Sequence, residues 1–349
     1  MKMLKNILKL TAIWMAATVS FTACEVDTTT VMFEEDHDFS QPGDTVFSML
    51  GILDKVQDVV EKGVLLGELR GALVKPDPFV GTSSAWVDLT RFENLENATF
   101  NRYRDYYAIV NNCNFYLERA DAEMERRGQK VFLKEYAAVS AYRAWAYLQL
   151  ALLYGEVPFY TQPLLSYSEI EQVMNDPSKR KGLGEICSYF IDDLLPYVDV
   201  PFPNYGNFTY DQSSSVNSFF LPIRLLRGDL YLWRGSLDGN KSDFAKAAQE
   251  YRDYLLSEKR FVSPDVKVAY RTVDMDGAQI VDRWSSVFLG NNYNESISLV
   301  PFAGNSQYGK LGSLRQSFRS FMGSDALQKL VDESYYCYVM YTEESESGE

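Results

Sequence analysis

The 349-residue sequence predicts an all-α fold, a helical-repeat scaffold that carries long irregular loops. Apolar residues recur at helical spacing along most of the chain. One segment is apolar on nearly every side, and a later segment has the pattern of a packed helix pair. Helices are expected at residues 45–74, 101–127, 131–154, 184–197, 216–235 and 242–257.

The first helical pattern, residues 45–74, is expected to break near Gly63 to Gly67, and Pro76 and Pro78 end it. Residues 76–100 are then expected to form a loop. The next pattern carries the stripe Tyr106, Val110, Cys113, Leu117, whose spacing indicates the buried face of a helix.

The segment Glu135 to Tyr154 predicts a buried helix. Small residues follow one stripe with a spacing of four, three, four and three: Ala137, Ala141, Ala144, Leu148 and Ala151. Arg143 is the only charged residue between Glu135 and Glu156. A helix that is apolar on most sides lies between neighbouring helices, which favours a solenoid over a simple bundle.

The segment Ser218 to Leu256 resembles a tetratricopeptide helix pair. Gly228 and the alanines near 247 stand where two such helices cross. Asp238-Gly239 is expected to form the turn, and Ser242 or Asp243 to cap the second helix. After residue 260 the signals weaken, and short strands are expected near 266–273 and 296–301.

The N-terminus predicts a lipoprotein signal peptide. Three lysines precede an uncharged run of 14 residues, Leu10 to Ala23, which is too short for a membrane-spanning helix of about 20 residues. Small residues stand directly before Cys24, as in a bacterial lipobox. We therefore expect a signal peptide over 1–23, a lipid on Cys24, an acidic tether over 24–43 and one folded domain over 44–349.

Composition excludes several classes of protein. A net charge of −14 argues against nucleic-acid binding. His37 is the only histidine, so histidine-rich metal sites are excluded, as is any serine–histidine–aspartate triad built on another histidine. Cys113, Cys187 and Cys337 form no CxxC pattern, and the first two are expected to be buried thiols. No catalytic residue, metal site or cofactor is expected.

One acidic segment has the start of a calcium loop. Thr272, Asp274, Asp276 and Gly277 have its spacing, but the twelfth position is Arg283 where a glutamate is required, so we interpret the segment as an acidic turn. The carboxylates elsewhere are too numerous for the sequence to single out a glycosidase pair.

Several stretches in the expected order resemble the SusD/RagB family of nutrient-uptake lipoproteins of the Bacteroidetes outer membrane. They are Cys24 to Asp27, Leu66 to Gly71, Tyr103 to Asp121, Lys134 to Phe159 and the helix pair 218–256. The most specific is Lys134 to Phe159, with its Arg-Ala pair, long apolar helix and Tyr-Gly-x-Val-Pro ending.

The resemblance implies a surface protein that is held in the outer membrane by the lipid on Cys24 and performs no chemistry. It would bind oligosaccharides or peptides and act as a lid on a SusC-like TonB-dependent transporter. Residues expected to contact the ligand lie in loops and are Trp86, Asp88, Arg91, Asn94, Trp284 and Tyr293. Family members are usually longer, so we expect a C-terminal portion to be missing.

Two alternatives stay open. One is a helical-repeat scaffold that binds only proteins, and the other is an α-helical glycosidase. Aromatic residues in the expected loops favour a ligand surface over a scaffold, because sugar rings stack their C–H faces on them. These aromatics are Trp86, Tyr160, Tyr167, Tyr205, Tyr210, Trp284 and Tyr293.

Overall fold

The computed structural model describes residues 39, 44–71, 74–77, 84–95, 102–205, 219–258, 272–273, 280–281 and 321–323. Within these residues the protein is predominantly helical, which confirms the predicted fold class. The helices are α2 (Asp44–Arg70), α3 (Ser84–Arg91), α4 (Arg104–Arg119), α5 (Leu133–Tyr154), α6 (Tyr167–Asn175), α7 (Leu183–Asp193), α8 (Ile223–Asp238) and α9 (Lys241–Glu258), with 3-10 turns η2 (Pro177–Lys179) and η3 (Leu195–Tyr197).

The strands are short and form four antiparallel pairs. They are β1 (Val74–Pro76) with β8 (Phe321–Gly323), β2 (Glu125–Arg126) with β3 (Gln129–Lys130), β4 (Val157–Pro158) with β5 (Arg180–Lys181), and β6 (Thr272–Val273) with β7 (Ile280–Val281).

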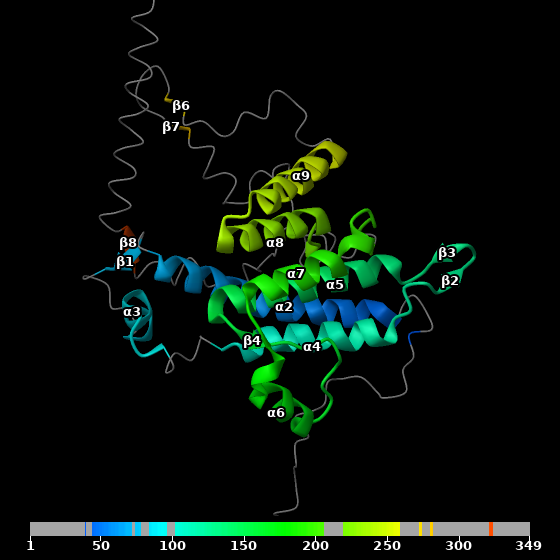
Figure 1. Cartoon of the computed structure of the whole chain (residues 1–349), viewed down its shortest axis with the longest axis horizontal. Helices are drawn as coiled ribbons and strands as arrows, with labels where there is room; N and C mark the ends of the chain where they lie inside the picture. The colour runs from blue at the N-terminus through cyan, green and yellow to red at the C-terminus, as the bar shows by residue number, and fades with distance from the viewer. Residues whose placement is uncertain are drawn as a thin grey trace, which may run out of the picture.

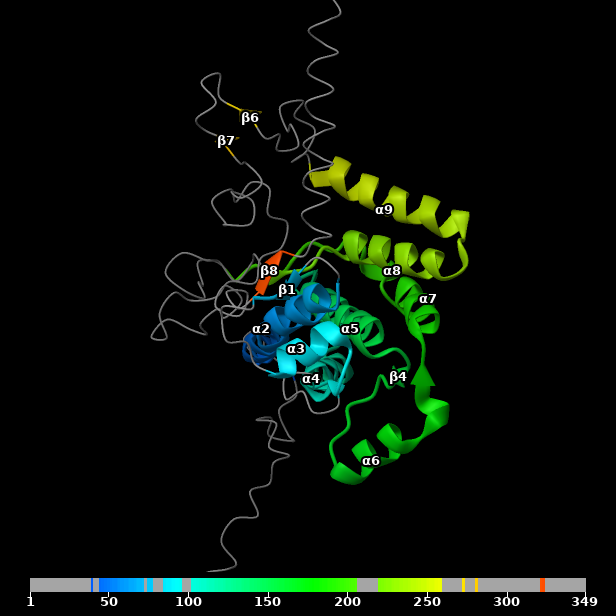
Figure 2. The same ribbon diagram turned by 90° about the vertical axis from the view of Figure 1, so that its left-hand side faces the viewer.

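Helices α2, α4 and α5 lie side by side, and α7, α8 and α9 follow them as successive layers (Figures 1 and 2). Each helix of this series packs mainly against its neighbours, as in a helical-repeat protein. Helix α6, in the segment that connects β4 to β5, projects away from these layers.

Helix α5 is the centre of the core, as its sequence predicts. All members of its small-residue stripe are at most 5% exposed, and α2, α4, α7 and α8 surround it. Tyr142 and Tyr147 are also fully buried, and each phenol finds a carbonyl acceptor. Tyr142 donates to Phe219 O (2.5 Å) and Tyr147 to Tyr160 O (2.7 Å), so the buried hydroxyls are satisfied.

Helices α8 and α9 form the predicted antiparallel pair. Gly228 lies at their crossing, where a Cβ atom would stand only 2.3 Å from the ring of Tyr251. Gly239 ends α8 with a φ of +70°, a left-handed conformation that glycine adopts without strain. The predicted caps at Ser242 and Asp243 are wrong. Asn240 Oδ1 instead accepts the N–H of Ser242, while Asp243 pairs with Arg234 at 2.7 Å.

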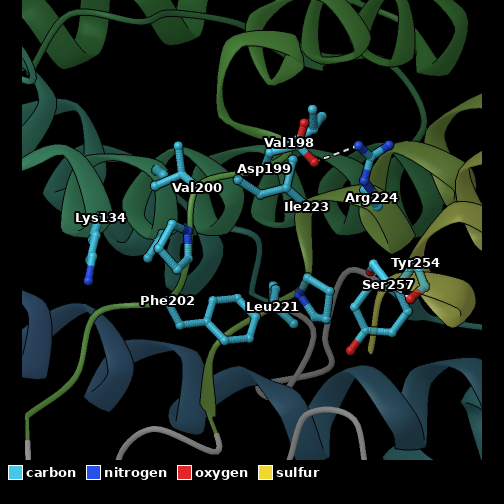
Figure 3. Close-up of a pocket in the computed structure, with 14 residues that line it drawn as sticks. Lys134, Val198, Asp199, Val200, Phe202, Leu221, Ile223, Arg224, Tyr254 and Ser257 are labelled. Carbon is cyan, nitrogen blue, oxygen red and sulfur yellow. Dashed lines mark hydrogen bonds and ion pairs between the residues drawn. The ribbon is translucent and has the colours of Figure 1, made fainter. Parts of the chain in front are cut away.

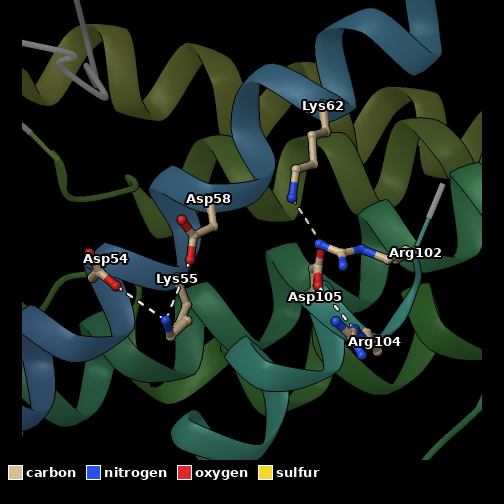
Figure 4. Close-up of polar contacts among 7 residues, drawn as sticks. All are labelled: Asp54, Lys55, Asp58, Lys62, Arg102, Arg104 and Asp105. Atoms are coloured by element: carbon tan, nitrogen blue, oxygen red, sulfur yellow. Dashed lines mark hydrogen bonds and ion pairs between the residues drawn. The ribbon is translucent and has the colours of Figure 1, made fainter. Parts of the chain in front are cut away.

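An ion cluster fastens α2 to α4 (Figure 4). Asp105 lies 2.9 Å from Lys62, 3.2 Å from Arg102 and 3.7 Å from Arg104. Partial burial opposes ionisation of the carboxyl group, but the hydrogen bond and charge of Lys62 and the two guanidinium groups together lower the pKa of Asp105.

Several predicted boundaries are wrong. Helix α2 continues through Gly63 and Gly67, because apolar residues along its whole length are buried: Val59 in the main core, and Leu65 and Leu69 in a smaller cluster with α3. A glycine inside a helix lowers helix stability by only about 1 kcal/mol relative to alanine. The free energy gained by burying these apolar side chains is larger. The predicted loop 76–100 contains helix α3, whose Leu89 is 2% exposed.

The helix predicted over 101–127 ends at Arg119, and a hairpin follows it. Arg127 and Gly128 have φ values of 52° and 74° between the paired strands β2 and β3, as a two-residue hairpin turn requires. Likewise α7 ends at Asp193 rather than at residue 197, because Pro196 lacks the N–H that would continue the helix.

The two described cysteines are buried and free, as predicted. Cys113 and Cys187 are 0% exposed. Burial raises the pKa of each thiol to about 12, so both stay protonated and inert at neutral pH. Cys24, His37 and Cys337 lie outside the described residues, as do the acidic turn at 274–277 and the strand predicted at 296–301.

Candidate ligand-binding surfaces

Four of the predicted ligand-binding residues lie together at the end of α2. Trp86, Asp88 and Arg91 stand on α3, and Asn94 follows it. We call these four residues the α3 surface. Trp284 and Tyr293, predicted with them, lie outside the described residues.

Trp86 is half-buried, so it is neither a free stacking platform nor a full core residue. It packs against a small cluster of Leu65, Leu66, Leu69 and Leu89. This cluster explains why α3 is a helix: Trp86 and Leu89 are three residues apart and reach the same apolar patch on α2. The remaining exposed part of the indole is the part that a ligand can contact.

The polar residues of the α3 surface face solvent. Asn94 Nδ2 lies 3.4 Å from Asp88 Oδ2, and the side chain of Arg91 is exposed. Asn94 has a φ of +46°, a conformation that asparagine tolerates better than most residues.

The other aromatics predicted to lie in loops divide between core and surface. Tyr160 is 9% exposed and stacks on Tyr107 at a centroid distance of 5.8 Å, so it belongs to the core. Tyr167 on α6 is 75% exposed. Tyr205 is half-buried and bonds to Glu135, and Tyr210 lies outside the described residues.

A pocket that the sequence did not predict lies between the start of α5, residues 198–202, the start of α8 and the end of α9 (Figure 3). Its volume is about 280 Å³. We call it the α5–α8 pocket. A shallower hollow of about 490 Å³ adjoins it beside β3 and shares Lys134, Asp199, Val200 and Pro201 with it.

The segment 198–202 forms one wall of the α5–α8 pocket, and the chain just after it is held to α5 through Glu135. Tyr205 donates to Glu135 Oε1 (2.7 Å), and Tyr116 donates to Glu135 Oε2 (3.0 Å). Phe202 rests on the buried ring of Phe220, with a centroid distance of 5.8 Å. Phe202 itself is 38% exposed, so one part of its ring is supported while another faces outward.

Charged groups stand on two sides of the α5–α8 pocket. Arg224 pairs with Asp199 (2.6 Å) and with Glu250 (3.2 Å), and these partners raise the pKa of the guanidinium group. On the other side, the ammonium group of Lys134 has no hydrogen bond or ion pair within the described part of the chain. Asp199 is the one carboxylate among the residues that line the pocket, so these residues do not supply the pair that a glycosidase uses.

The sequence could not single out this pocket. Lys134, Asp199 and Arg224 are far apart in the chain, and they line one pocket only because α5, α7 and α8 pack as layers. Among the described residues no cluster of histidine, cysteine, aspartate or glutamate could hold a metal ion. Of the helices described above, none combines the length and apolarity needed to span a membrane.

No protein-family model matches the sequence, and no curated protein matches it. Solved structures do match. The chain is similar to B. fragilis NanU, with 18% sequence identity and a TM-score of 0.51, over 75% of this chain and 48% of NanU. The fold is SusD-like.

Two further similar structures have lower scores. A SusD superfamily protein from Parabacteroides distasonis is 19% identical with a TM-score of 0.45, over 60% of this chain and 45% of its own. A laminarin-binding SusD-like protein is 15% identical with a TM-score of 0.46, over 73% and 50%. The chain therefore spans about half the length of the solved structures it matches. The predicted resemblance is confirmed at the level of the fold.

Proposed function

We propose that this protein is a cell-surface lipoprotein that binds oligosaccharides and delivers them to a SusC-like TonB-dependent transporter. The observation that carries the proposal is the SusD-like fold built around the Lys134 to Phe159 segment, the most specific of the sequence matches. A similarity of fold supports this role, and the α3 surface and the α5–α8 pocket supply places for a ligand.

The side chains of the α3 surface suit ligand binding. The α3 surface combines part of an indole face with an amide, a carboxylate and a guanidinium group, which can hold hydroxyl groups in a fixed orientation. Stacking on the indole would add about 1–3 kcal/mol, by analogy with other aromatic stacking contacts. The same groups could bind a peptide backbone, so peptide capture is the second candidate ligand class.

The lipid anchor belongs to the same proposal. Signal peptidase would release residues 1–23, Cys24 would carry the lipid, and the acidic tether after it would connect the lipid to the folded domain, whose core already includes Phe39. The acidic composition of that tether suits an extended segment, because like charges repel each other.

A cell experiment tests the proposal. The native bacterium would express the wild-type protein, Cys24→Ala or the control Cys337→Ala, and uptake of fluorescent oligosaccharides and peptides would be measured. We expect the Cys24→Ala protein to be absent from the outer membrane and its cells to stop taking up one oligosaccharide class. Cells with Cys337→Ala should behave like the wild type. Mass spectrometry of the mature N-terminus should show an acylated Cys24.

Three outcomes would contradict the proposal. A mature chain that begins at another residue and carries no lipid would refute the proposed anchor on Cys24. Uptake of peptides but of no oligosaccharide would show that the ligand is a peptide. Normal uptake of every probe by Cys24→Ala cells favours a scaffold that binds only proteins.

A further inference from the structure

We infer that the α5–α8 pocket is a second saccharide subsite, which holds one sugar ring apart from the α3 surface. This inference rests on the proposed function, because it takes the ligand to be an oligosaccharide. It adds a location and a ring count that the fold similarity does not contain.

Size favours a single ring. Pockets for drug-sized ligands measure about 300–1,000 Å³, and the α5–α8 pocket at about 280 Å³ is slightly smaller than that range. The adjoining hollow shares four of its residues, so a chain bound through one ring has room to continue toward β3.

The apolar wall suits the C–H face of a sugar. The outward part of the Phe202 ring supplies a flat surface, and its position is fixed by Phe220 behind it. Pro201 and Pro222 restrict the backbone on either side of the pocket. A supported, partly exposed aromatic ring loses little freedom when a ligand stacks on it.

The polar groups of the pocket suit the hydroxyl groups of a sugar. Lys134 can donate three hydrogen bonds from one side, and Asp199, whose side chain is 80% exposed, can accept several from the other. Hydroxyl groups both donate and accept, so a sugar can bond to both sides of the pocket.

Methyl NMR tests this location directly. The probes are the hexaoses of glucose in α-1,4, β-1,3 and β-1,4 linkage, those of mannose and xylose, and two hexapeptides. The Ile223 δ1 methyl reports on the α5–α8 pocket, the Leu89 methyls report on the α3 surface, and Ile109 in the core is the reference. We expect at least one saccharide to shift Ile223 in a saturable way.

Variants connect that shift to the named residues. Phe202→Ala should weaken the interaction seen at Ile223 by about 5- to 150-fold, the range for one aromatic stacking contact. Phe244→Ala is the matched control, because Phe244 has the same 38% exposure but lies at the opposite end of α9. Lys134→Ala changes only an exposed side chain, so it tests the site even if Phe202→Ala unfolds.

The possible failures are distinguishable. Saccharide shifts at Leu89 without any at Ile223 would overturn this subsite and leave the proposed function standing. Ile223 shifts caused only by peptides, or unchanged by both Phe202→Ala and Lys134→Ala, would also overturn it. Absence of any saccharide binding would contradict the subsite and the proposed ligand class together.

Discussion

Substituting Gly228 by alanine tests the packing of the α8–α9 pair. The added Cβ would stand 2.3, 2.7 and 2.9 Å from three ring atoms of Tyr251, distances that real Cβ atoms do not adopt. Either the helices separate or the Tyr251 ring moves. Movement of the ring would break its 2.6 Å hydrogen bond to Asp229.

The magnitude follows from opposing terms. Alanine in place of a mid-helix glycine favours the helix by about 1 kcal/mol. Overpacking costs about 1–3 kcal/mol, and loss of the Tyr251–Asp229 hydrogen bond costs about 1 kcal/mol more. We expect Gly228→Ala to lower the free energy of unfolding by about 1–3 kcal/mol.

The control is Gly51→Ala in α2. Gly51 is exposed, and nothing lies within 4 Å of its added Cβ, so only the helix preference acts and stability should rise by about 0.5–1 kcal/mol. Urea unfolding followed by circular dichroism measures both variants. In a Tyr251→Ala background, Gly228→Ala should lose its penalty. A stabilising effect of Gly228→Ala in the wild-type background would refute the close crossing.

Three further predictions concern other parts of the fold. Trp86→Ala should lower both the saccharide affinity and the free energy of unfolding. Because Trp86 is half-buried, the loss of stability should be less than the roughly 3–5 kcal/mol of a fully buried aromatic. Calorimetric titration measures the affinity and thermal unfolding the stability, and unchanged stability would contradict the packing of Trp86 on the α2 leucines. Iodoacetamide at pH 8 should leave Cys113 and Cys187 unlabelled until the protein unfolds, because burial raises each pKa to about 12; peptide mass spectrometry would detect early labelling that refutes this. The folded-state pKa of Asp105 is lowered, so its stabilisation should be present above the ordinary value of 3.8 and lost as pH falls below it. The stability difference between wild type and Asp105→Asn should shrink over that window, and a constant difference would contradict the ion cluster.

Helices with a long apolar period could be predicted from the sequence. The boundaries 131–154 and 242–257 lie within two residues of α5 and α9, because periodicity and glycine or turn residues mark both ends. Helix α3 could not be predicted in the same way. Its eight residues are too few for a periodic signal, and it forms because Trp86 and Leu89 find a leucine patch on α2.

The candidate sites show the same limit. The α3 surface could be proposed because its residues are close in sequence and the family resemblance indicates that region. The α5–α8 pocket joins Lys134, Phe202 and Arg224 from three separate elements, so no local pattern marks it. The turn at Arg127 and Gly128 was missed because arginine is an unusual residue at a positive φ.

The most direct test of the proposed role is a calorimetric titration of the purified mature protein with oligosaccharides, followed by chromatography of the recovered sugar. We expect saturable binding of one oligosaccharide class, with the saccharide recovered at its original length after prolonged incubation. Release of shorter products that stops when a single aspartate or glutamate is replaced would show a glycosidase. Binding of peptides with no binding of any saccharide would contradict the proposed ligand class.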